Sequence, residues 1–444
     1  MKVAIIGSGV SGLGAAYALK DAHDVTLYEK DDRLGGHANT VRIDYDGTQI
    51  DVDTGFIVYN QRNYPNLVGL LETLGVESAE TDMSFAFAGG GREWSSNFPR
   101  GVFAQKRNIA SPRFLRMLAD ISRFNRQAQD DLAAGAVDDL TLGGYLRLRG
   151  YGKAFERDYL LPMGAAIWST SEGGIAEAPA ESFLRFFSNH SLLQMVQPSW
   201  RTIKGGSQAY VAKLAAILGD RLRIGVGAQQ VRRLERGVTV IDSSGARDVF
   251  DHVIFACHSD QALALLESAD LDERAFLGAI RYAPNTAYLH RDTTLMPSRR
   301  PAWGSWNYMA GAAGEAAGGV TYWMNSLQHI DPRKPLFVSL NPAAAPDPAL
   351  TFQVFDYDHP QFDTPSLASQ RQFGRVQGRG GVWYAGAWLG YGFHEDGLTA
   401  GLRVAHALGG SVPWAFVDHR IQGGALAAPG AAPQSPRERG AVRA

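Results

Sequence analysis

Cysteine is almost absent from this chain of 444 residues, and Cys257 is the single one. One thiol excludes an intramolecular disulfide framework and argues against a cysteine metal cluster, which fits a reducing compartment. No run of about 18 apolar residues occurs, so no membrane-spanning helix is predicted. No H-x-x-x-H or comparable spacing predicts a metal site. We therefore expect a cytoplasmic protein without a secretory leader and without a bound metal.

An excess of charge of one sign is also lacking. The 43 Lys and Arg residues nearly balance the 45 Asp and Glu residues, and the net charge is −2. Nothing in this balance favours a nucleic-acid partner. The length suffices for two or more compact units, and a hydrophobic content of 45% is that of a globular protein. Residues 423–444 are rich in Gly, Ala, Pro and Arg and are predicted to be disordered.

The N-terminal residues have the pattern of a dinucleotide-binding unit. Val3–Ile6 is a short apolar run, typical of a buried parallel strand. Gly7, Gly9 and Gly12 follow it with G-x-G-x-x-G spacing, and Leu13–Lys20 is predicted to be helical. The glycines permit a tight turn, close approach of a pyrophosphate, and close packing of the helix on the strand. The amides and dipole at the helix N-terminus suit an anion.

A second predicted strand, Val25–Tyr28, ends at Glu29. A carboxylate there accepts hydrogen bonds from both hydroxyls of a ribose and repels a 2′-phosphate, which argues against NADP. Arg33 and the pair Gly35-Gly36 complete an E-x-x-x-R-x-G-G pattern that resembles the glutathione-reductase-type flavoproteins. In that family the arginine and the glycine pair help to bind the FAD diphosphate. His37 stands where the amine-oxidase branch usually has arginine, so phosphate binding there is expected to be weaker or titratable.

Two further motifs resemble the same kind of protein. The D-x-G element in Asp51–Phe56 resembles the segment that passes beside the flavin. The glycine pair in Ile203–Ser207 opens an amphipathic helix, followed by predicted strands that include 221–224, 230–234, 238–241 and 253–256. Ala228 is the match to the backbone segment that touches adenine in relatives.

The last motif lies near the C-terminus. Val382–Trp388 is predicted to be a strand that ends at Ala385-Gly386, and a helix is predicted to begin near Asp396. In relatives the N-terminus of that helix faces the flavin N1–O2 edge, where its dipole stabilises the anionic reduced ring. The acidic residue that often follows the Ala-Gly pair is missing, because Ala387 occupies its place.

These motifs fall into three separated groups, near the N-terminus, from residue 203 onward and near the C-terminus. In this order over most of the chain they resemble the flavin amine oxidase superfamily, alongside protoporphyrinogen oxidases and carotenoid desaturases. The stretches GAAIWSTS, SLNP and AWGSWNY look like a bacterial branch of predicted NAD/FAD-binding flavoproteins. That branch is associated with cyclopropane-fatty-acid-synthase-like methyltransferases and with furan fatty acid formation, so a methyltransferase is a candidate partner. The resemblance implies an α/β fold, namely a glutathione-reductase-type FAD-binding Rossmann domain with an inserted α+β substrate domain.

The predicted FAD-binding domain is discontinuous and comprises residues 1–83, 203–271 and 375–422, and the substrate domain comprises 84–202 and 272–374. No cysteine lies in the C-terminal motif, so FAD is expected to be noncovalent. The predicted cofactor-binding residues come from all the motifs: Gly7, Gly9, Ser11, Gly12, Glu29, Lys30, Arg33, Gly35, Gly36, His37, Thr54, Gly55, Ala228, Gly386, Asp396, Gly397 and Leu398.

The substrate half contains most of the aromatic residues, which suggests an apolar cavity beside a packed core. Desaturation of an acyl chain needs a base as well as the flavin, and the candidates by motif position are His394, Tyr391 and Tyr59. Many amine oxidases keep a lysine near the flavin, but the corresponding segment Tyr282–His290 contains none.

One predicted helix is basic and amphipathic. Ser111 and Pro112 form its cap and first turn, and arginines recur from Arg113 to Arg126. Such a helix can lie on the anionic inner face of a membrane, or it can be an ordinary surface helix whose apolar side covers the domain core.

The sequence therefore predicts an FAD-dependent oxidoreductase that desaturates a lipid-like, methyl-branched acyl chain by hydride transfer to flavin N5. Three alternatives stay open. They are an amine or amino-acid oxidase, a redox-neutral flavin isomerase of unsaturated fatty acids, and a flavin-binding partner of a methyltransferase without activity of its own.

Overall fold

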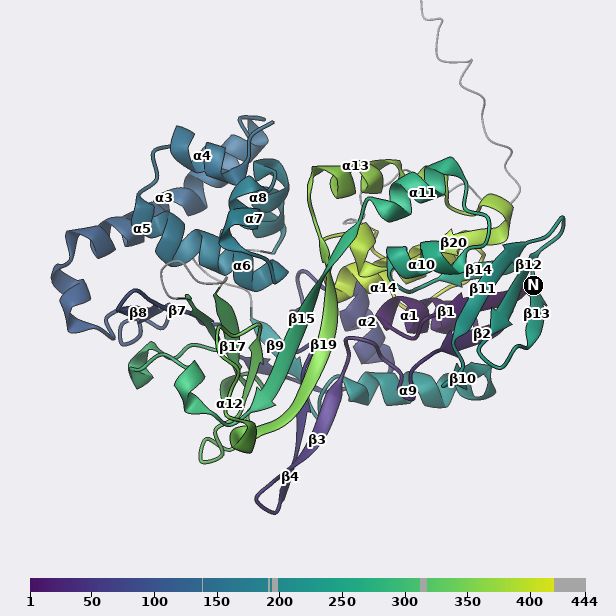
Figure 1. Cartoon of the computed structure of the whole chain (residues 1–444), viewed down its shortest axis with the longest axis horizontal. Helices are drawn as coiled ribbons and strands as arrows, with labels where there is room; N and C mark the ends of the chain where they lie inside the picture. The colour runs from purple at the N-terminus through teal and green to yellow at the C-terminus, as the bar shows by residue number, and fades with distance from the viewer. Residues whose placement is uncertain (138, 191, 194–198, 312–317, 419–444) are drawn as a thin grey trace, which may run out of the picture.

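A five-stranded parallel sheet in the order β10-β2-β1-β14-β20 forms one half of the molecule (Figure 1). The structure is a computed structural model that describes residues 1–137, 139–190, 192–193, 199–311 and 318–418. The predicted tail 423–444 lies outside the described residues. The strands of this sheet are β10 (Leu222–Ile224), β2 (Asp24–Glu29), β1 (Lys2–Ile6), β14 (His252–Phe255) and β20 (Val382–Tyr384).

Strand β1 lies between β2 and β14 and pairs with both in parallel register. Its residues after Lys2 are all apolar and buried, because helices cover both faces of such a sheet. Every residue of α1 (Val10–Leu19) is buried as well, and this helix packs against α9 (Gln208–Leu218) and α14 (His394–Ala407). The predicted Rossmann unit is therefore present, with its strand ends gathered beside the start of α1.

A three-stranded antiparallel sheet accompanies the parallel one; strands were predicted at 230–234 and 238–241, whereas its third strand was not predicted. It consists of β11 (Ala228–Arg233), β12 (Val238–Asp242) and β13 (Arg247–Phe250). The connection to α10 (Ser259–Leu265) and α11 (Leu271–Gly278) then leads into the second half of the molecule.

The second half contains a seven-stranded mixed sheet below a layer of helices (Figure 1). Two long strands, β15 (Arg281–His290) and β19 (Thr351–Gln361), run between the two halves and pair along nearly their whole length. The other strands are β18 (Phe337–Leu340), β17 (Gly319–Trp323), β16 (Trp306–Met309), β7 (Phe85–Gly89) and β8 (Arg92–Ser95). The helical layer comprises α3 (Pro112–Ala133), α4 (Leu142–Leu148), α5 (Lys153–Phe155), the π-helical turn Glu156–Leu160, α6 (Leu161–Trp168), α7 (Glu172–Glu177) and α8 (Ala180–Asn189).

Smaller elements join the halves. The hairpin of β3 (Thr40–Tyr45) and β4 (Thr48–Asp53) shares a hydrophobic core with β15, β18 and α12 (Met324–Leu327). Although the sequence assigned this hairpin to the FAD-binding domain, its side chains Ile43, Tyr45 and Val52 pack on the other sheet. The remaining elements are β5 (Val58–Asn60), α2 (Pro65–Thr73), β6 (Ser78–Thr81), β9 (Trp200–Ile203) and α13 (Thr364–Gln372).

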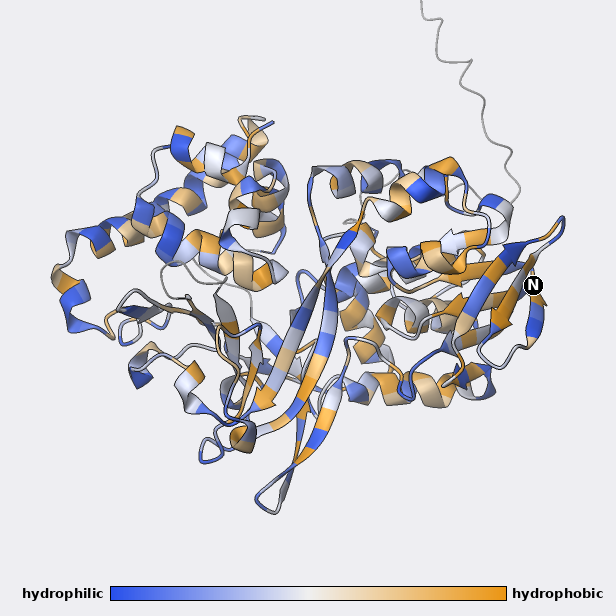
Figure 2. Cartoon of the chain, viewed as in Figure 1, coloured by the Kyte–Doolittle hydropathy of each residue, from blue (hydrophilic) through white to orange (hydrophobic). Residues whose placement is uncertain are grey.

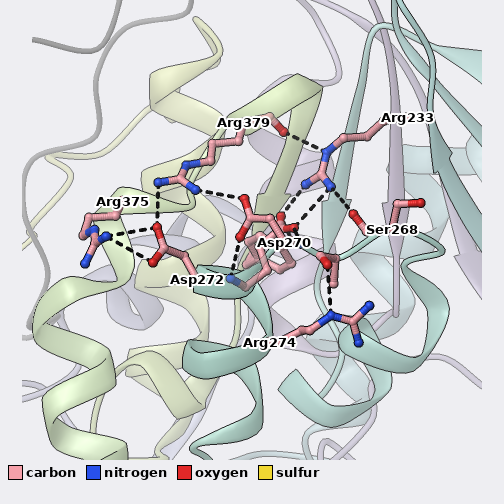
Figure 3. A network of polar contacts seen from close by, with 10 residues as sticks. Arg233, Ser268, Asp270, Asp272, Arg274, Arg375 and Arg379 are labelled. Carbon is pink, nitrogen blue, oxygen red and sulfur yellow. Dashed lines mark hydrogen bonds and ion pairs between the residues drawn. The ribbon is translucent and has the colours of Figure 1, made fainter. Parts of the chain in front are cut away.

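A network of ion pairs fastens the C-terminal part of the chain to the segment around α11 (Figure 3). Arg233 pairs with the fully buried carboxylate of Glu273, which also accepts a hydrogen bond from Tyr384 at 2.7 Å. Nearer the surface, Arg379 pairs with Asp270 and Asp272 at 2.9 and 3.0 Å. Strands β11 and β20 and helix α11 are thereby held in one frame.

In the part of the chain that the structure describes, no helix combines the length and apolarity needed to cross a bilayer. The same residues include no group of His, Cys, Asp and Glu side chains arranged to hold a metal ion.

Candidate functional site

A cavity of about 1050 Å³ extends from the glycine loop after β1 to the helical layer of the second half. Small-molecule sites usually occupy about 300–1,000 Å³. The volume therefore lies just above that range, which suits a site for a dinucleotide together with a second molecule.

The glycine loop forms one end of this cavity. Gly7 has φ +105°, and a side chain on Gly12 would place its Cβ 1.9 Å from the Gly7 carbonyl oxygen. A Cβ on Gly9, in contrast, would meet nothing within 4 Å. Helix α1 begins at Val10 without a side-chain cap, so its first amides and its dipole are available to an anion. Gly7, Gly9 and Ser11 line the cavity, whereas Gly12 is a packing residue that does not.

Glu29 at the end of β2 is buried at 7% exposure and lines the cavity. One of its oxygens accepts hydrogen bonds from the backbone N–H and the hydroxyl of Ser8, at 2.9 and 2.5 Å. The other accepts from the Asp31 N–H at 2.9 Å. A carboxylate has about four acceptor positions, so about one is left for a ribose hydroxyl. The sequence had suggested hydrogen bonds to both hydroxyls.

Arg33, predicted to help bind the FAD diphosphate, contacts the backbone of the glycine pair. Its guanidinium donates to the Gly36 carbonyl oxygen at 2.9 Å, and the residue does not line the cavity. The Gly35 N–H donates to the Ser8 carbonyl at 3.1 Å, and a Cβ on Gly36 would lie 3.3 Å from Gly9 Cα. Arg33 therefore closes the second glycine loop, whose backbone packs on the first loop and lines the cavity.

Lys30 is the one Lys or Arg residue among the described residues that line the cavity. A diphosphate bound here would consequently be held by backbone amides and the α1 dipole, with little help from side-chain cations. Ala228 also lines the cavity, next to Gly227, where a Cβ would lie 2.8 Å from Lys30 Cβ. This close approach places the start of β11 against the end of β2.

Three histidines meet on the cavity wall beside the glycine pair. The ring of His37 lies 5.4 Å from that of His359 and 6.4 Å from that of His258, centre to centre. Tyr357 lies 5.0 Å from His37, and Tyr282 stacks on His258 at 4.3 Å. Burial lowers the pKa of all three histidines, for His359 to about 4, and the neighbouring His359 lowers that of His37 further. All three are neutral at physiological pH, so they offer ring N–H donors and acceptors rather than charge.

The Nε2 atom of His37 is buried and has no hydrogen-bond partner among the described residues. An orphaned polar atom in a cavity wall usually marks the place of a missing ligand or water. Together with the open face of Gly9 and the remaining acceptor of Glu29, it shows that the residues present fit a dinucleotide. His258 and His359 were not identified from the sequence, although His258 closely follows the predicted strand 253–256, because their approach to His37 depends on contacts between distant segments.

The D-x-G segment joins two motifs. Thr54 and Gly55 line the cavity, and a Cβ on Gly55 would lie 2.3 Å from the His37 carbonyl oxygen. The buried carboxylate of Asp53 accepts hydrogen bonds from the N–H and hydroxyl of Ser207, which follows the glycine pair of residues 205–206. Burial nevertheless raises the pKa of Asp53 to about 6.

The C-terminal helix α14 begins at His394, two positions before the predicted start. It lies directly on α1, since a Cβ on Gly401 would come within 2.0 Å of the Ser11 carbonyl oxygen. Gly397 and Leu398 take part in this packing and do not line the cavity. Asp396, also predicted to bind the cofactor, is fully buried and accepts hydrogen bonds from the N–H groups of Tyr391 and Phe393. These residues shape the loop that brings Gly386 and residues 391–394 into the cavity wall.

Two of the three predicted catalytic residues line the cavity, namely Tyr391 and His394. His394 stacks on Phe56 with ring centres 3.9 Å apart, and its Nε2 lies 2.7 Å from the Tyr210 hydroxyl. Burial lowers the pKa of His394 to about 3, so it is a weak base at neutral pH. Tyr59 lies outside the cavity, where its hydroxyl donates to Ser78 Oγ at 2.8 Å.

The other arm of the cavity is apolar. Among the described lining residues between positions 102 and 192, none is Asp, Glu, Lys or Arg. They come from the loop after β8, α3, the turn before α6, α6, α8 and the residues that directly follow α6 and α8. They are Val102, Leu118, Ile121, Asn125, Tyr159, Met163, Ile167, Trp168, Ser169, Phe186, His190 and Leu192. Tyr391 stands at the junction of the two arms, with its ring 5.7 Å from that of Phe186.

Comparison with known proteins agrees with this geometry. Residues 10–290 match the family model described as "Flavin containing amine oxidoreductase". A Mycobacterium tuberculosis protein named as a flavin-containing monoamine oxidase, AofH, is 27% identical over 261 residues, which are 55% of this chain and 54% of that protein. The chain thus spans about half the length of the curated relatives that it matches over this region.

Solved structures share the fold over nearly the whole chain. Putrescine oxidase bound to putrescine has a TM-score of 0.66 at 16% identity, covering 92% of this chain and 99% of that chain. A CLA-producing fatty acid isomerase from P. acnes has a TM-score of 0.64 at 17% identity, covering 90% and 96%. Identities this low establish the fold alone. Since the family model covers more than half of the sequence, the chain belongs to the flavin containing amine oxidoreductase family, with FAD as its cofactor.

Proposed function

We propose that the protein is an FAD-dependent oxidoreductase that desaturates a lipid-like acyl chain, with methyl-branched chains as the first candidates. The observation that carries this proposal is the apolar arm, which between positions 102 and 192 has no charged side chain among its described lining residues and meets the cofactor arm at Tyr391; Glu80 and Asp82 line the same cavity outside this stretch. An alkyl chain gains free energy from leaving water for such a wall, at roughly 25 cal/mol per Å² of apolar surface buried. Along that stretch of the wall a charged substrate would find no oppositely charged side chain.

The residues of the chain fit FAD, and different groups of them would bind its two portions. The glycine loop, the α1 amides, Glu29 and His37 would contact its dinucleotide portion, and Gly386 with residues 391–394 would contact the redox-active ring. FAD, when bound, supplies the acceptor for two electrons from the substrate. Phe56 and Tyr210 keep the His394 ring in one orientation, and the apolar arm excludes water from the reacting carbons.

Removal of two hydrogens from neighbouring carbons also requires a group that takes one of them as a proton. His394 is a poor candidate because its pKa is lowered to about 3. Tyr391 and His190 are the remaining titratable side chains near the junction, with ring centres 6.4 Å apart. We assign the proton to His190, whose Nδ1 faces the Phe186 carbonyl oxygen at 3.1 Å and whose Nε2 is then the basic nitrogen, and we assign Tyr391 to the position nearest the reacting carbons. Tyr391→Phe is expected to slow turnover without weakening FAD binding.

A second candidate is a redox-neutral isomerase of unsaturated fatty acids. The observation that favours it is the scarcity of bases in the apolar arm, because moving a double bond by removing and returning a hydride needs no external electron acceptor. The fatty acid isomerase among the structural neighbours has the same fold. The amine or amino-acid oxidase alternative is suggested by the names of AofH and putrescine oxidase.

Anaerobic titration of the FAD-loaded protein distinguishes these functions. The flavin absorbance is followed while methyl-branched acyl phospholipids, unsaturated fatty acids and amines are added separately. If the protein is a desaturase, an acyl lipid bleaches the flavin and is converted to a product with two fewer hydrogens. An isomerase produces a shifted double bond without lasting bleaching. Bleaching by amines alone would contradict the proposal.

A pair of leucine substitutions tests the apolar arm itself. Leu118→Asp places a charge among the lining residues of α3, whereas Leu148 on α4 is 65% exposed and provides the matched surface control. Acyl-lipid bleaching should be lost in Leu118→Asp and kept in Leu148→Asp, with FAD bound in both. The proposed methyltransferase partner is tested separately, by asking whether its purified methylated lipid product bleaches the flavin better than the unmethylated lipid.

A further inference from the structure

Residues 96–119 carry five basic side chains and no acidic one, in a chain whose net charge is −2. The basic residues are Arg100, Lys106, Arg107, Arg113 and Arg116. The segment includes the loop after β8, the 3-10 turn Lys106–Ala110 and the first turns of α3. It lies at the left edge of Figure 1, on the far side of the molecule from the parallel sheet.

Most of these cations have no acidic partner inside the protein. Arg113 pairs with Asp158 at 2.9 Å. No ion pair is formed by Arg100, Lys106, Arg107 or Arg116 within the described part of the chain, and all four are exposed. Their field is therefore uncompensated locally and attracts an anionic surface.

Large apolar side chains are exposed in the same segment. Phe98 is 80% exposed, Ile109 59% and Leu115 45%. Hydrophobic and basic residues that are exposed together are the combination by which peripheral proteins insert into the boundary of a bilayer.

The rest of α3 is engaged in the protein, although hydrophobic and hydrophilic residues alternate along it (Figure 2). Its apolar residues Phe114, Met117 and Phe124 are buried in the core of the helical layer. Arg123 pairs with Asp120 and lies 4.1 Å from the centre of the Tyr151 ring. The helix as a whole consequently cannot lie flat on a membrane, as its sequence allowed, and the surface available for contact is residues 98–116.

Exposed residues of the cavity lining lie directly beside this segment. Ser96 and Asn97 line the cavity and are exposed, and Phe98 follows them directly. Beneath the segment, Val102, Leu118 and Ile121 belong to the wall of the apolar arm. The uncompensated cations and the exposed apolar side chains thus belong to the same segment as exposed residues of the cavity lining, which is where we place an opening of the arm.

From this placement we infer that residues 98–116 dock the protein on an anionic lipid bilayer, with the opening at Ser96 and Asn97 turned toward the acyl chains. The benefit for substrate access rests on the proposed function. The docking itself rests on the charge and exposure of the segment.

Vesicle co-sedimentation of the FAD-loaded protein tests the docking without any turnover. Wild-type protein should sediment with vesicles of phosphatidylcholine mixed with phosphatidylglycerol and remain in solution with phosphatidylcholine alone. Arg100→Glu with Lys106→Glu should weaken binding by more than about tenfold, since each cation near such a surface contributes substantially. Phe98→Ser should weaken it as well.

The matched control is Arg236→Glu with Arg247→Glu, which makes the same change of charge at two exposed positions near β12 and β13. This control should bind as wild type does. Docking is refuted if wild type ignores anionic vesicles, the result expected for a surface that binds a protein partner instead, or if both double variants lose binding equally. If vesicles bind but no acyl lipid bleaches the flavin, the proposed function fails and the docking stands.

Discussion

The contact between α1 and α14 gives the most direct test of how the cofactor arm is built. At Gly401 a Cβ would lie 2.0 Å from the carbonyl oxygen of Ser11 and 2.9 Å from its carbonyl carbon. Both atoms belong to the backbone of a fully buried helix, so no side chain can rotate away to make room. An ordinary contact of about 3.4 Å would require α14 to move by roughly 1.4 Å relative to α1.

In Gly401→Ala, overpacking of the core is expected to cost about 3 kcal/mol of stability, the upper end of its usual range. The higher helix propensity of alanine offsets up to about 1 kcal/mol of that cost. Because α14 begins at His394 in the cavity wall, the same displacement should weaken FAD binding. Gly278→Ala is the matched control, since Gly278 is also helical and the nearest atom to its Cβ would be Leu263 Cδ2, 3.9 Å away.

The assay is urea unfolding with and without FAD, together with the FAD dissociation constant from quenching of flavin fluorescence. Gly278→Ala should be as stable as wild type or slightly more stable, and it should bind FAD normally. Wild-type stability and wild-type FAD affinity in Gly401→Ala would refute the argument that direct backbone contact between the two helices sets the cavity wall.

Three further predictions concern single side chains. Glu29→Gln should raise the FAD dissociation constant by about 10- to 100-fold in fluorescence titrations, the loss expected for one charge-assisted hydrogen bond; unchanged affinity would show that Glu29 only orders its loop. The pKa of His394 is about 3 in the folded protein and 6.5 in the unfolded chain. Because the unfolded chain takes up the proton first, the folded protein has its full stability above pH 6.5 and loses stability as the pH falls, by about 2 kcal/mol at pH 5. His394→Phe should therefore show a shallower loss of stability between pH 7 and pH 5 in urea unfolding, and an identical slope would contradict the assigned burial. Glu273→Gln should cost about 3 kcal/mol because it leaves Arg233 unpaired, whereas Glu267→Gln at an exposed pair should cost under about 1 kcal/mol; equal losses would argue against a special role for the buried pair.

Local patterns were sufficient for the parts of the site that lie close together in the sequence. The strand, glycine loop, helix and second strand up to Glu29 have the order that the sequence predicts, because each element follows from neighbouring residues. The apolar cavity was also foreseeable from the aromatic content of the substrate half. The contact of Arg33 with the Gly36 carbonyl oxygen was not predicted, since a motif shows that a cation is present but not which nearby acceptor it reaches, and its role at the diphosphate stays a prediction.

By itself the sequence determined that a parallel dinucleotide fold would form and that its cofactor arm would begin at Gly7, because glycine conformation and buried apolar strands are local properties. Only the tertiary structure decided the histidine group of His37, His258 and His359, and the burial of the apolar side of α3. Both depend on contacts between segments far apart in the chain. An amphipathic sequence pattern is the same for a helix that faces a bilayer and for one that faces a protein core, so the pattern alone does not distinguish them.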